Sequence, residues 1–237
     1  MNNFFKKLLT PFIFKLISLK KYAVRMAAIR SAVQVSKLVN STNKGLFIDC
    51  GSNLGQGFTF FEQYFPLKIF DFILVEPNPY CEEALTNKIA AKKNEGSIEL
   101  IKKAASTSDG TTKFFGLVED DRGKTSEGGS ILKEHASAWY THSEEDAITV
   151  ETFSLTDLII NKANRYKIIV LKMDIEGGEY EVLDDLLKHG AHKKIAIIFT
   201  EFHSQYMTDP DKTIYKSREK VIIQSFKQEK IPFKNWV

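Results

Sequence analysis

Four short apolar runs in this sequence each end at an acidic residue. The acids are Asp49, Glu76, Asp174 and Glu201, and His203 follows the last of them by two positions. Apolar runs of this length are typical of strands buried on both faces of a parallel sheet. Ligand sites of open α/β sheets lie beyond the carboxyl ends of the strands. We therefore expect these polar groups to converge on a single crevice.

The stretch that follows the first run carries three glycines, and their spacing narrows the class of ligand. It reads D-C-G-S-N-L-G-Q-G-F, with Gly51, Gly55 and Gly57. Glycines let a backbone approach a ligand closely. The spacing is not the G-x-G-x-x-G of dinucleotide sites, and no Lys-Ser or Lys-Thr makes a P-loop. An acid before the first glycine would repel a pyrophosphate but suits an amino or sulfonium cation, which points to S-adenosylmethionine.

Glu76 stands 27 positions after Asp49, at the end of the second apolar run. An acid at about this distance in a βαβ unit typically binds ribose hydroxyls. Pro77 and Pro79 end the strand and fix the position of the carboxylate. The alternative interpretation is that Glu76 only caps the helix that follows.

Several motifs together resemble those of the FkbM-type methyltransferases, over about residues 45–205. They are D-C-G-S-N-L-G at 49–55, E-P-N-P at 76–79, A-A-S at 104–106 with Asp109-Gly110, G-G-S at 128–130, L-K-M-D-I-E-G at 171–177 and E-F-H at 201–203. The D-x-E-G motif after a Lys-Met pair is the most specific of these. The resemblance implies a class I, Rossmann-like, S-adenosylmethionine-dependent methyltransferase that methylates a hydroxyl of a sugar, glycan or related metabolite.

The resemblance also implies roles for individual residues. The loop 49–55 would hold the methionine part of the donor, Glu76 the ribose, and residues 103–106 would lie near the adenine. The residues we assign to the cofactor are Asp49, Gly51, Asn53, Gly55, Gln56, Glu76, Asn78 and Ala105.

The residues we assign to catalysis are Asp174, Glu176 and His203, because a general base at the acceptor hydroxyl accelerates its attack and His titrates near neutral pH. Two other interpretations stay open. Glu176 and Glu179 could instead stabilise the N-terminus of the next helix. Asp174, Glu176, Glu201 and His203 could bind a hard divalent cation that acidifies the hydroxyl, although we assign no metal to the protein.

These groups require an α/β fold with a mostly parallel central sheet and helices on both faces. We expect one domain over 45–237, preceded by a basic helical extension over 1–44, because 237 residues with 43% hydrophobic content suit one sizeable core.

The segment 118–147 shows no periodicity, and we expect it to be a substrate loop whose histidines, His135 and His142, are solvated. This fold class usually ends in an antiparallel hairpin, yet only one strand fits after the helix expected over 214–228.

The charge is unevenly distributed along the chain. Residues 1–45 hold nine Lys or Arg and no acid, whereas the remainder holds 24 basic and 30 acidic residues. Nucleic acid is not favoured as a partner, because the body lacks a basic, aromatic patch. Residues 3–20 predict an amphipathic helix that lies in a membrane interface, packs on the domain or forms a dimer contact; a transit peptide is a third interpretation. A second helix is expected over 23–38.

No stretch reaches the ~20 apolar residues of a membrane span. Cys50 and Cys81 lack metal-site spacing, so we expect reduced thiols in a cytoplasmic protein. A peripheral position at a membrane, through the first helix, is an alternative location. The alternative function is a non-catalytic binding module of the same fold at a membrane or glycan-assembly complex. The acids at four strand ends argue against it.

Overall fold

The structure, a computed structural model, describes residues 22–117, 123–125, 127–135 and 144–236. An N-terminal helix occupies residues 22–36. The strands are β1 (Gly45–Cys50), β2 (Phe70–Val75), β3 (Ile98–Ile101), β4 (Ala104–Ser106), β5 (Gly110–Phe114), β6 (Ile148–Ser154), β7 (Ile168–Met173), β8 (Ile195–Thr200) and β9 (Phe233–Asn235). The helices are α2 (Gln56–Phe61), α3 (Glu82–Lys92), α4 (Leu155–Lys162), α5 (Glu179–Lys188) and α6 (Asp211–Gln228), with short 3-10 turns η1 (Pro79–Cys81), η3 (Ala191–Lys194) and η4 (Ser204–Tyr206).

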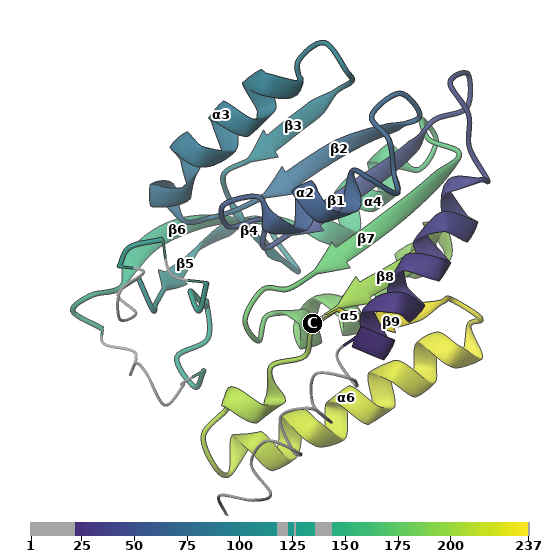
Figure 1. The fold of residues 1–237 in the computed structure, drawn as a ribbon. Coiled ribbons are helices and arrows are strands. Elements are labelled where there is room, and N and C mark those ends of the chain that lie inside the picture. The colour runs from purple at the N-terminus through teal and green to yellow at the C-terminus, as the bar shows by residue number, and fades with distance from the viewer. Residues whose placement is uncertain (1–21, 118–122, 126, 136–143, 237) are drawn as a thin grey trace, which may run out of the picture.

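The central sheet has the strand order β3-β2-β1-β7-β8-β9, and every pairing in it is parallel (Figure 1). The chain builds outward from β1 to β3 on one side and from β7 to β9 on the other. The strand order therefore reverses at β1, which places the crevice of such a sheet beside the carboxyl ends of β1 and β7. This is the Rossmann-like α/β fold predicted from the sequence.

Helices cover both faces of the sheet because successive residues of each strand point to opposite sides. On β1, Leu46, Ile48 and Cys50 join a core with α4, α5 and α6. Phe47, between them, joins a second core that includes α2 and α3. Ala28 and Ala32 of the N-terminal helix are fully buried in that second core, so this helix packs directly on the sheet.

A smaller sheet of order β4-β6-β5 lies next to the carboxyl end of β3. β4 pairs with β6 in parallel, and β5 pairs with β6 antiparallel. β6 passes straight into α4, whose N-terminus is capped by the Ser154 hydroxyl accepting from the backbone N–H of Asp157, and serine is a preferred residue at this position. Residues 127–129, Ile131 and His135, which follow β5 in the chain, lie at the crevice.

The C-terminal edge of the sheet consists of one three-residue strand in the described part of the chain. β9 pairs with β8 in parallel, through Phe233, Lys234 and Asn235. Among the described residues, the last strand of the sheet is therefore a short parallel one.

Two sequence predictions concern segments at and near the N-terminus. The amphipathic helix expected over 3–20 lies outside the described residues and stays a prediction. The helix expected over 23–38 is present as residues 22–36. None of the helices that the structure describes has the length and apolar character that crossing a membrane requires. Cys50 and Cys81 are buried free thiols.

We predict that Phe47→Ala lowers the free energy of unfolding by about 3–5 kcal/mol. The Phe47 ring is fully buried and lies 5.0–5.1 Å, centroid to centroid, from Phe61, Phe65 and Phe72, so truncation leaves a cavity between strand and helix. Urea denaturation measures the change. The control is Tyr22→Ala, where the side chain is 65% exposed and the loss should stay within about 0.5 kcal/mol. Equal losses in the two variants would contradict the assignment of Phe47 to the core.

Candidate active site

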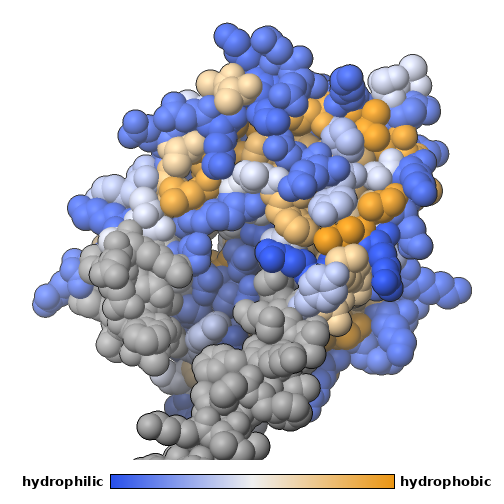
Figure 2. Space-filling model, viewed as in Figure 1, coloured by the Kyte–Doolittle hydropathy of each residue, from blue (hydrophilic) through white to orange (hydrophobic). Residues whose placement is uncertain are grey.

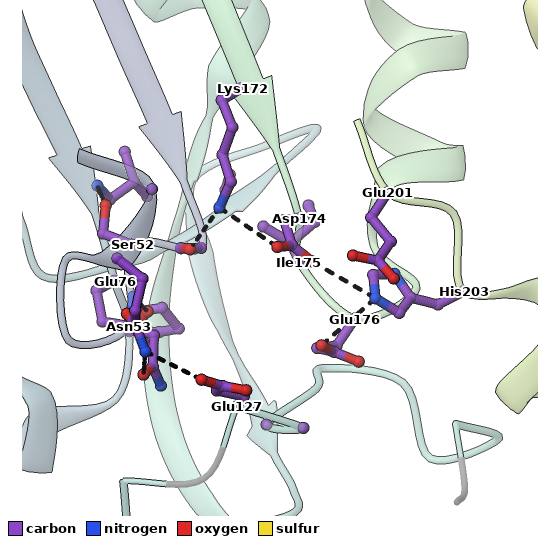
Figure 3. Close-up of a pocket in the computed structure, with 18 of the residues that line it drawn as sticks. Ser52, Asn53, Glu76, Glu127, Lys172, Asp174, Ile175, Glu176, Glu201 and His203 are labelled. Atoms are coloured by element: carbon purple, nitrogen blue, oxygen red, sulfur yellow. Dashed lines mark hydrogen bonds and ion pairs between the residues drawn. The ribbon is translucent and has the colours of Figure 1, made fainter. Parts of the chain in front are cut away.

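A cavity of about 500 Å³ opens at the carboxyl ends of the central strands, within the usual range for a small-molecule site. Figure 2 shows a hollow near the centre of this face with mostly hydrophilic residues around it. In Figure 3, Asn53 and Glu76 lie at one side, and Asp174, Glu176, Glu201 and His203 gather at the other. Lys172 reaches between the two groups. Polar groups from four strand ends thus meet in one place.

The glycine loop after β1 brings two backbone segments into close contact. Gly51 has φ of 79°, and a Cβ there would collide with the backbone carbonyl oxygen of Asp174. The N–H of Gly51 donates to the carbonyl of Val75 (3.0 Å), which ties the loop to β2. Only glycine therefore allows the loop after β1 to touch the loop after β7. Gly55 has φ of 82° and starts α2, but it does not line the cavity.

Glu76 is held rigidly at the edge of the cavity. Its two carboxylate oxygens accept hydrogen bonds from the backbone N–H groups of Asn53 (2.7 Å) and Asn78 (2.9 Å). A carboxylate has lone pairs beyond these two, so it can still accept from a ligand. Burial raises the pKa of Glu76 to about 7, and the two backbone hydrogen bonds only partly oppose that rise.

Three amide side chains fasten the 124–127 segment to the glycine loop and to β2. Asn78 donates to the carbonyl of Lys124 (2.8 Å), Asn53 to that of Thr125 (3.2 Å), and Gln56 to the carboxylate of Glu127 (3.0 Å). Asn53 and Gln56 line the cavity, whereas Asn78 lies behind its surface. These side chains build one wall of the site, a role that their positions in the sequence did not reveal.

Lys172 joins the glycine loop to the other side of the cavity. Its ammonium donates to the carbonyl of Gly51 (2.8 Å) and lies 3.1 Å from Asp49 and 3.5 Å from Asp174. Burial by itself lowers the pKa of Lys172, but the two carboxylates outweigh burial and raise it. Asp49 is fully buried beneath the cavity and does not line it. Asp49 therefore faces a cation of the protein itself.

His203 lies at the centre of the polar residues on the side of the cavity opposite Glu76. Its Nδ1 and its backbone N–H both contact one oxygen of the fully buried Glu179, at 2.9 Å and 3.0 Å. The other oxygen of Glu179 accepts from the backbone N–H of Gly177 (2.8 Å). The Nε2 atom faces Glu176 at 3.4 Å and Asp174 at 3.5 Å. The ring is thus fixed from behind and presents Nε2 to two carboxylates.

Burial and these contacts shift the pKa values of Asp174, Glu176 and His203. Burial raises the pKa of Asp174, and Lys172 and His203 only partly oppose it. Burial would also raise the pKa of Glu176, but hydrogen bonds from His135 and His203 lower it to about 2. Burial by itself would lower the pKa of His203. The carboxylates of Glu179 and Glu176 have a larger effect and raise the pKa of His203 well above its usual value. A neutral, basic His203 is therefore disfavoured in this arrangement.

His135 corrects one sequence prediction, because this loop histidine is not solvated. It is 1% exposed, its Nε2 lies 3.0 Å from Glu176, and its ring centroid is 5.9 Å from that of His203. Ser130, from the same segment, donates to the carbonyl of Glu176 (2.6 Å), which has φ of 53°. Nothing in the local sequence singles out His135, since it reaches the site through tertiary contacts. His142 lies outside the described residues.

Most of the residues proposed from the sequence line this cavity. Those that do are Gly51, Asn53, Gln56, Glu76, Ala105, Asp174, Glu176, Glu201 and His203. Asp49, Gly55 and Asn78 do not line it; they shape or support its wall. From the sequence we predicted no role for Lys172, which appeared only as a member of the L-K-M-D-I-E-G motif. A lysine inside an apolar strand nevertheless indicates a buried ion pair. The cluster with metal-ligand spacing is Asp174, Glu176 and His203, without Glu201.

Comparisons with known proteins give two matches. The family model of the Methyltransferase FkbM domain matches residues 49–219, more than half of the chain. A crystal structure of the methyltransferase FkbM from Methylobacillus flagellatus KT is 14% identical with a TM-score of 0.46, over 76% of this chain and 37% of that one. The present chain thus spans little more than a third of that protein's length. No curated protein matches the sequence.

We predict that Gly51→Ala is far more damaging than Gly190→Ala. Both glycines have a left-handed φ, 79° and 73°, which costs an alanine about 1–2 kcal/mol. Only at Gly51 does the new Cβ also meet backbone; at Gly190 nothing lies within 4 Å. Urea denaturation should therefore show a larger loss for Gly51→Ala, by at least about 1 kcal/mol beyond the control. Similar losses would mean that the two loops do not touch.

Proposed function

Because the chain belongs to the FkbM methyltransferase family, we propose that it is an S-adenosylmethionine-dependent O-methyltransferase acting on a hydroxyl of a sugar, glycan or related metabolite. The observation that carries the proposal is one cavity with two chemically different sides. Glu76 and the glycine loop form one side, and Asp174, Glu176 and His203 form the other. This division suits a donor and an acceptor held next to each other.

The residues of the first side fit the donor. Gly51, Asn53 and Gln56 would hold its amino-acid part, Glu76 its ribose hydroxyls, and Ala104 and Ala105 would pack near its base. Their cavity has the volume that a ligand of this size needs, and the absence of a side chain at Gly51 leaves backbone at its surface. S-adenosylmethionine, when bound, supplies a methyl group on a positively charged sulfur.

The second side binds and orients the acceptor. Carboxylates and an imidazole accept hydrogen bonds, which suits an acceptor that carries hydroxyl groups. Correct alignment of the reacting atoms can supply ~7–11 kcal/mol of the barrier, so positioning by these side chains dominates the catalysis. Asp174, 24% exposed and facing the cavity, is the group placed to take the proton of the hydroxyl. The raised pKa of His203 means that this ring already carries its proton near neutral pH and is not free to accept another.

Donor affinity tests the assignment of Glu76. We expect calorimetry to show binding of S-adenosylmethionine to the wild type, and Glu76→Gln to weaken it about 10- to 100-fold, the cost of losing hydrogen bonds to a charged group. The matched control is Glu83→Gln, an exposed acid on the first turn of α3 that does not line the cavity. Absence of binding to the wild type, or unchanged binding to Glu76→Gln, would refute the donor assignment.

The raised pKa of Glu76 also fixes the direction of its pH dependence. Because the ionised form is the better acceptor for hydroxyls, the affinity of the wild type for the donor should fall as the pH falls through about 7. Stability changes in the opposite sense. The pKa of Glu76 is about 7 in the folded protein, against its usual 4.5. Between these two pH values the folded state holds the proton and the unfolded state does not. The free energy of unfolding therefore falls as the pH rises across this range. Glu76→Gln should lose both dependences.

We predict that Asp174→Asn reduces turnover by about 10²–10⁴-fold, the usual contribution of a general base. The change keeps the shape of the side chain, so circular dichroism and donor affinity should stay close to those of the wild type. Methyl transfer to hydroxyl acceptors, followed by mass spectrometry, measures the loss. Asp157→Asn, on the exposed first turn of α4, is the control and should be fully active. Full activity of Asp174→Asn would remove this carboxylate from the reaction.

A further inference from the structure

Three side chains on the acceptor side of the cavity each aim one atom at the same point. Asp174 Oδ1 and Glu176 Oε1 lie 3.5 Å and 3.4 Å from His203 Nε2. The three ligand atoms lie within 4.8 Å of one another. A cation at their centre would contact all three at the ~2.0–2.3 Å of a coordination bond after small side-chain adjustments.

The second atom of each of these side chains already has a partner in the protein. Asp174 Oδ2 lies 3.5 Å from the Lys172 ammonium, and Glu176 Oε2 lies 3.0 Å from His135 Nε2. His203 Nδ1 contacts the Glu179 carboxylate at 2.9 Å. Metal-binding histidines almost always hold a carboxylate or carbonyl through the ring nitrogen that does not bind the metal, and metal-binding carboxylates are likewise held from behind. This outer shell leaves the three inner atoms oriented toward one another.

The balance of charge at this point calls for a cation. Lys172 is shared between Asp49 and Asp174, and Glu176 and Glu179 add two further carboxylates around His203. His203 is 2% exposed, and Glu179 is fully buried. Buried charges are costly unless they are paired. Four carboxylates face the Lys172 ammonium and the His203 imidazole here, so a dication in place of the proton on His203 would stabilise this group of acids.

We propose that Asp174, Glu176 and His203 bind a divalent cation of the Mg²⁺ or Mn²⁺ kind. One imidazole and two carboxylates on one side of the ion form a facial set that leaves coordination positions open. Because all three residues line the cavity, the open positions face the space where the acceptor binds. This inference rests on the proposed function: the ion would take the acceptor hydroxyl as a ligand and lower its pKa. Asp174 would then act as a ligand of the ion, and the hydroxyl proton would pass to water.

The test is a titration of the full-length protein, free of any histidine tag, with Mn²⁺ alone. Electron paramagnetic resonance of free Mn²⁺ counts the bound ions, and no donor or acceptor is added. We expect one saturable site, from which Mg²⁺ displaces the Mn²⁺. Asp174→Asn and Glu176→Gln keep the shape of each side chain and should weaken binding at least ~10-fold. Glu179→Gln changes the carboxylate that holds His203 Nδ1 from behind and should weaken binding by ~10–100-fold.

The control is Glu127→Gln, which removes an acid from the same cavity but outside the cluster and should leave Mn²⁺ affinity unchanged. Thermal unfolding of each variant shows whether it folds. Absence of saturable binding to the wild type, or equal affinity in the wild type and Asp174→Asn, overturns the proposal, and a proton on His203 then occupies the point between the carboxylates. Donor affinity is measured separately, so failure of the metal site and failure of the methyltransferase assignment are distinguishable.

Discussion

The buried ammonium of Lys172 is the interaction on which the arrangement of the site depends. It joins Asp49 at the end of β1, the Gly51 carbonyl in the glycine loop and Asp174 after β7. A buried charge is tolerated only when it is paired, so these three groups must stay together. Because β1 and β7 flank the reversal of strand order, this ion pair holds the two sides of the crevice in register.

The two sides then differ in what surrounds their acids. Glu76 is buried and accepts hydrogen bonds from two backbone N–H groups, and burial raises its pKa to about 7. Glu176 is also largely buried, but two imidazoles face it and its pKa falls to about 2. Similar carboxylates thus acquire different chemistry from their neighbours alone. A neutralisable acid suits contacts with hydroxyls, and a permanently ionised one suits a cation.

The segment between β5 and β6 connects these two environments. At Lys124 and Thr125 its backbone is held by amides from the donor side, while Ser130 and His135 contact Glu176 on the other side. Gly177 has φ of 105°, and a Cβ there would lie close to the side chains of Met207 and Leu132. Residues that follow β5 in the chain therefore contact both sides of the cavity.

The sequence alone determined the Rossmann-like fold and the approximate place of nearly every strand. Buried parallel strands are continuous apolar runs, and the acids that end them are visible without coordinates. It also identified Glu76, Asp174, Glu176 and His203 as residues of one crevice, since all carboxyl ends of a parallel sheet lie at the same edge. These are local patterns combined with one rule of topology.

The tertiary structure alone decided which groups pair. Asp49 precedes the glycine loop but faces Lys172, and His135, in a segment without periodicity, reaches Glu176 from a distant part of the chain. The sequence left room for one strand after α6, but its parallel pairing with β8 is set by the packing at the edge of the sheet. Ion pairs and long-range contacts depend on distances between side chains far apart in sequence, and only the packing of the sheet and its loops sets those distances.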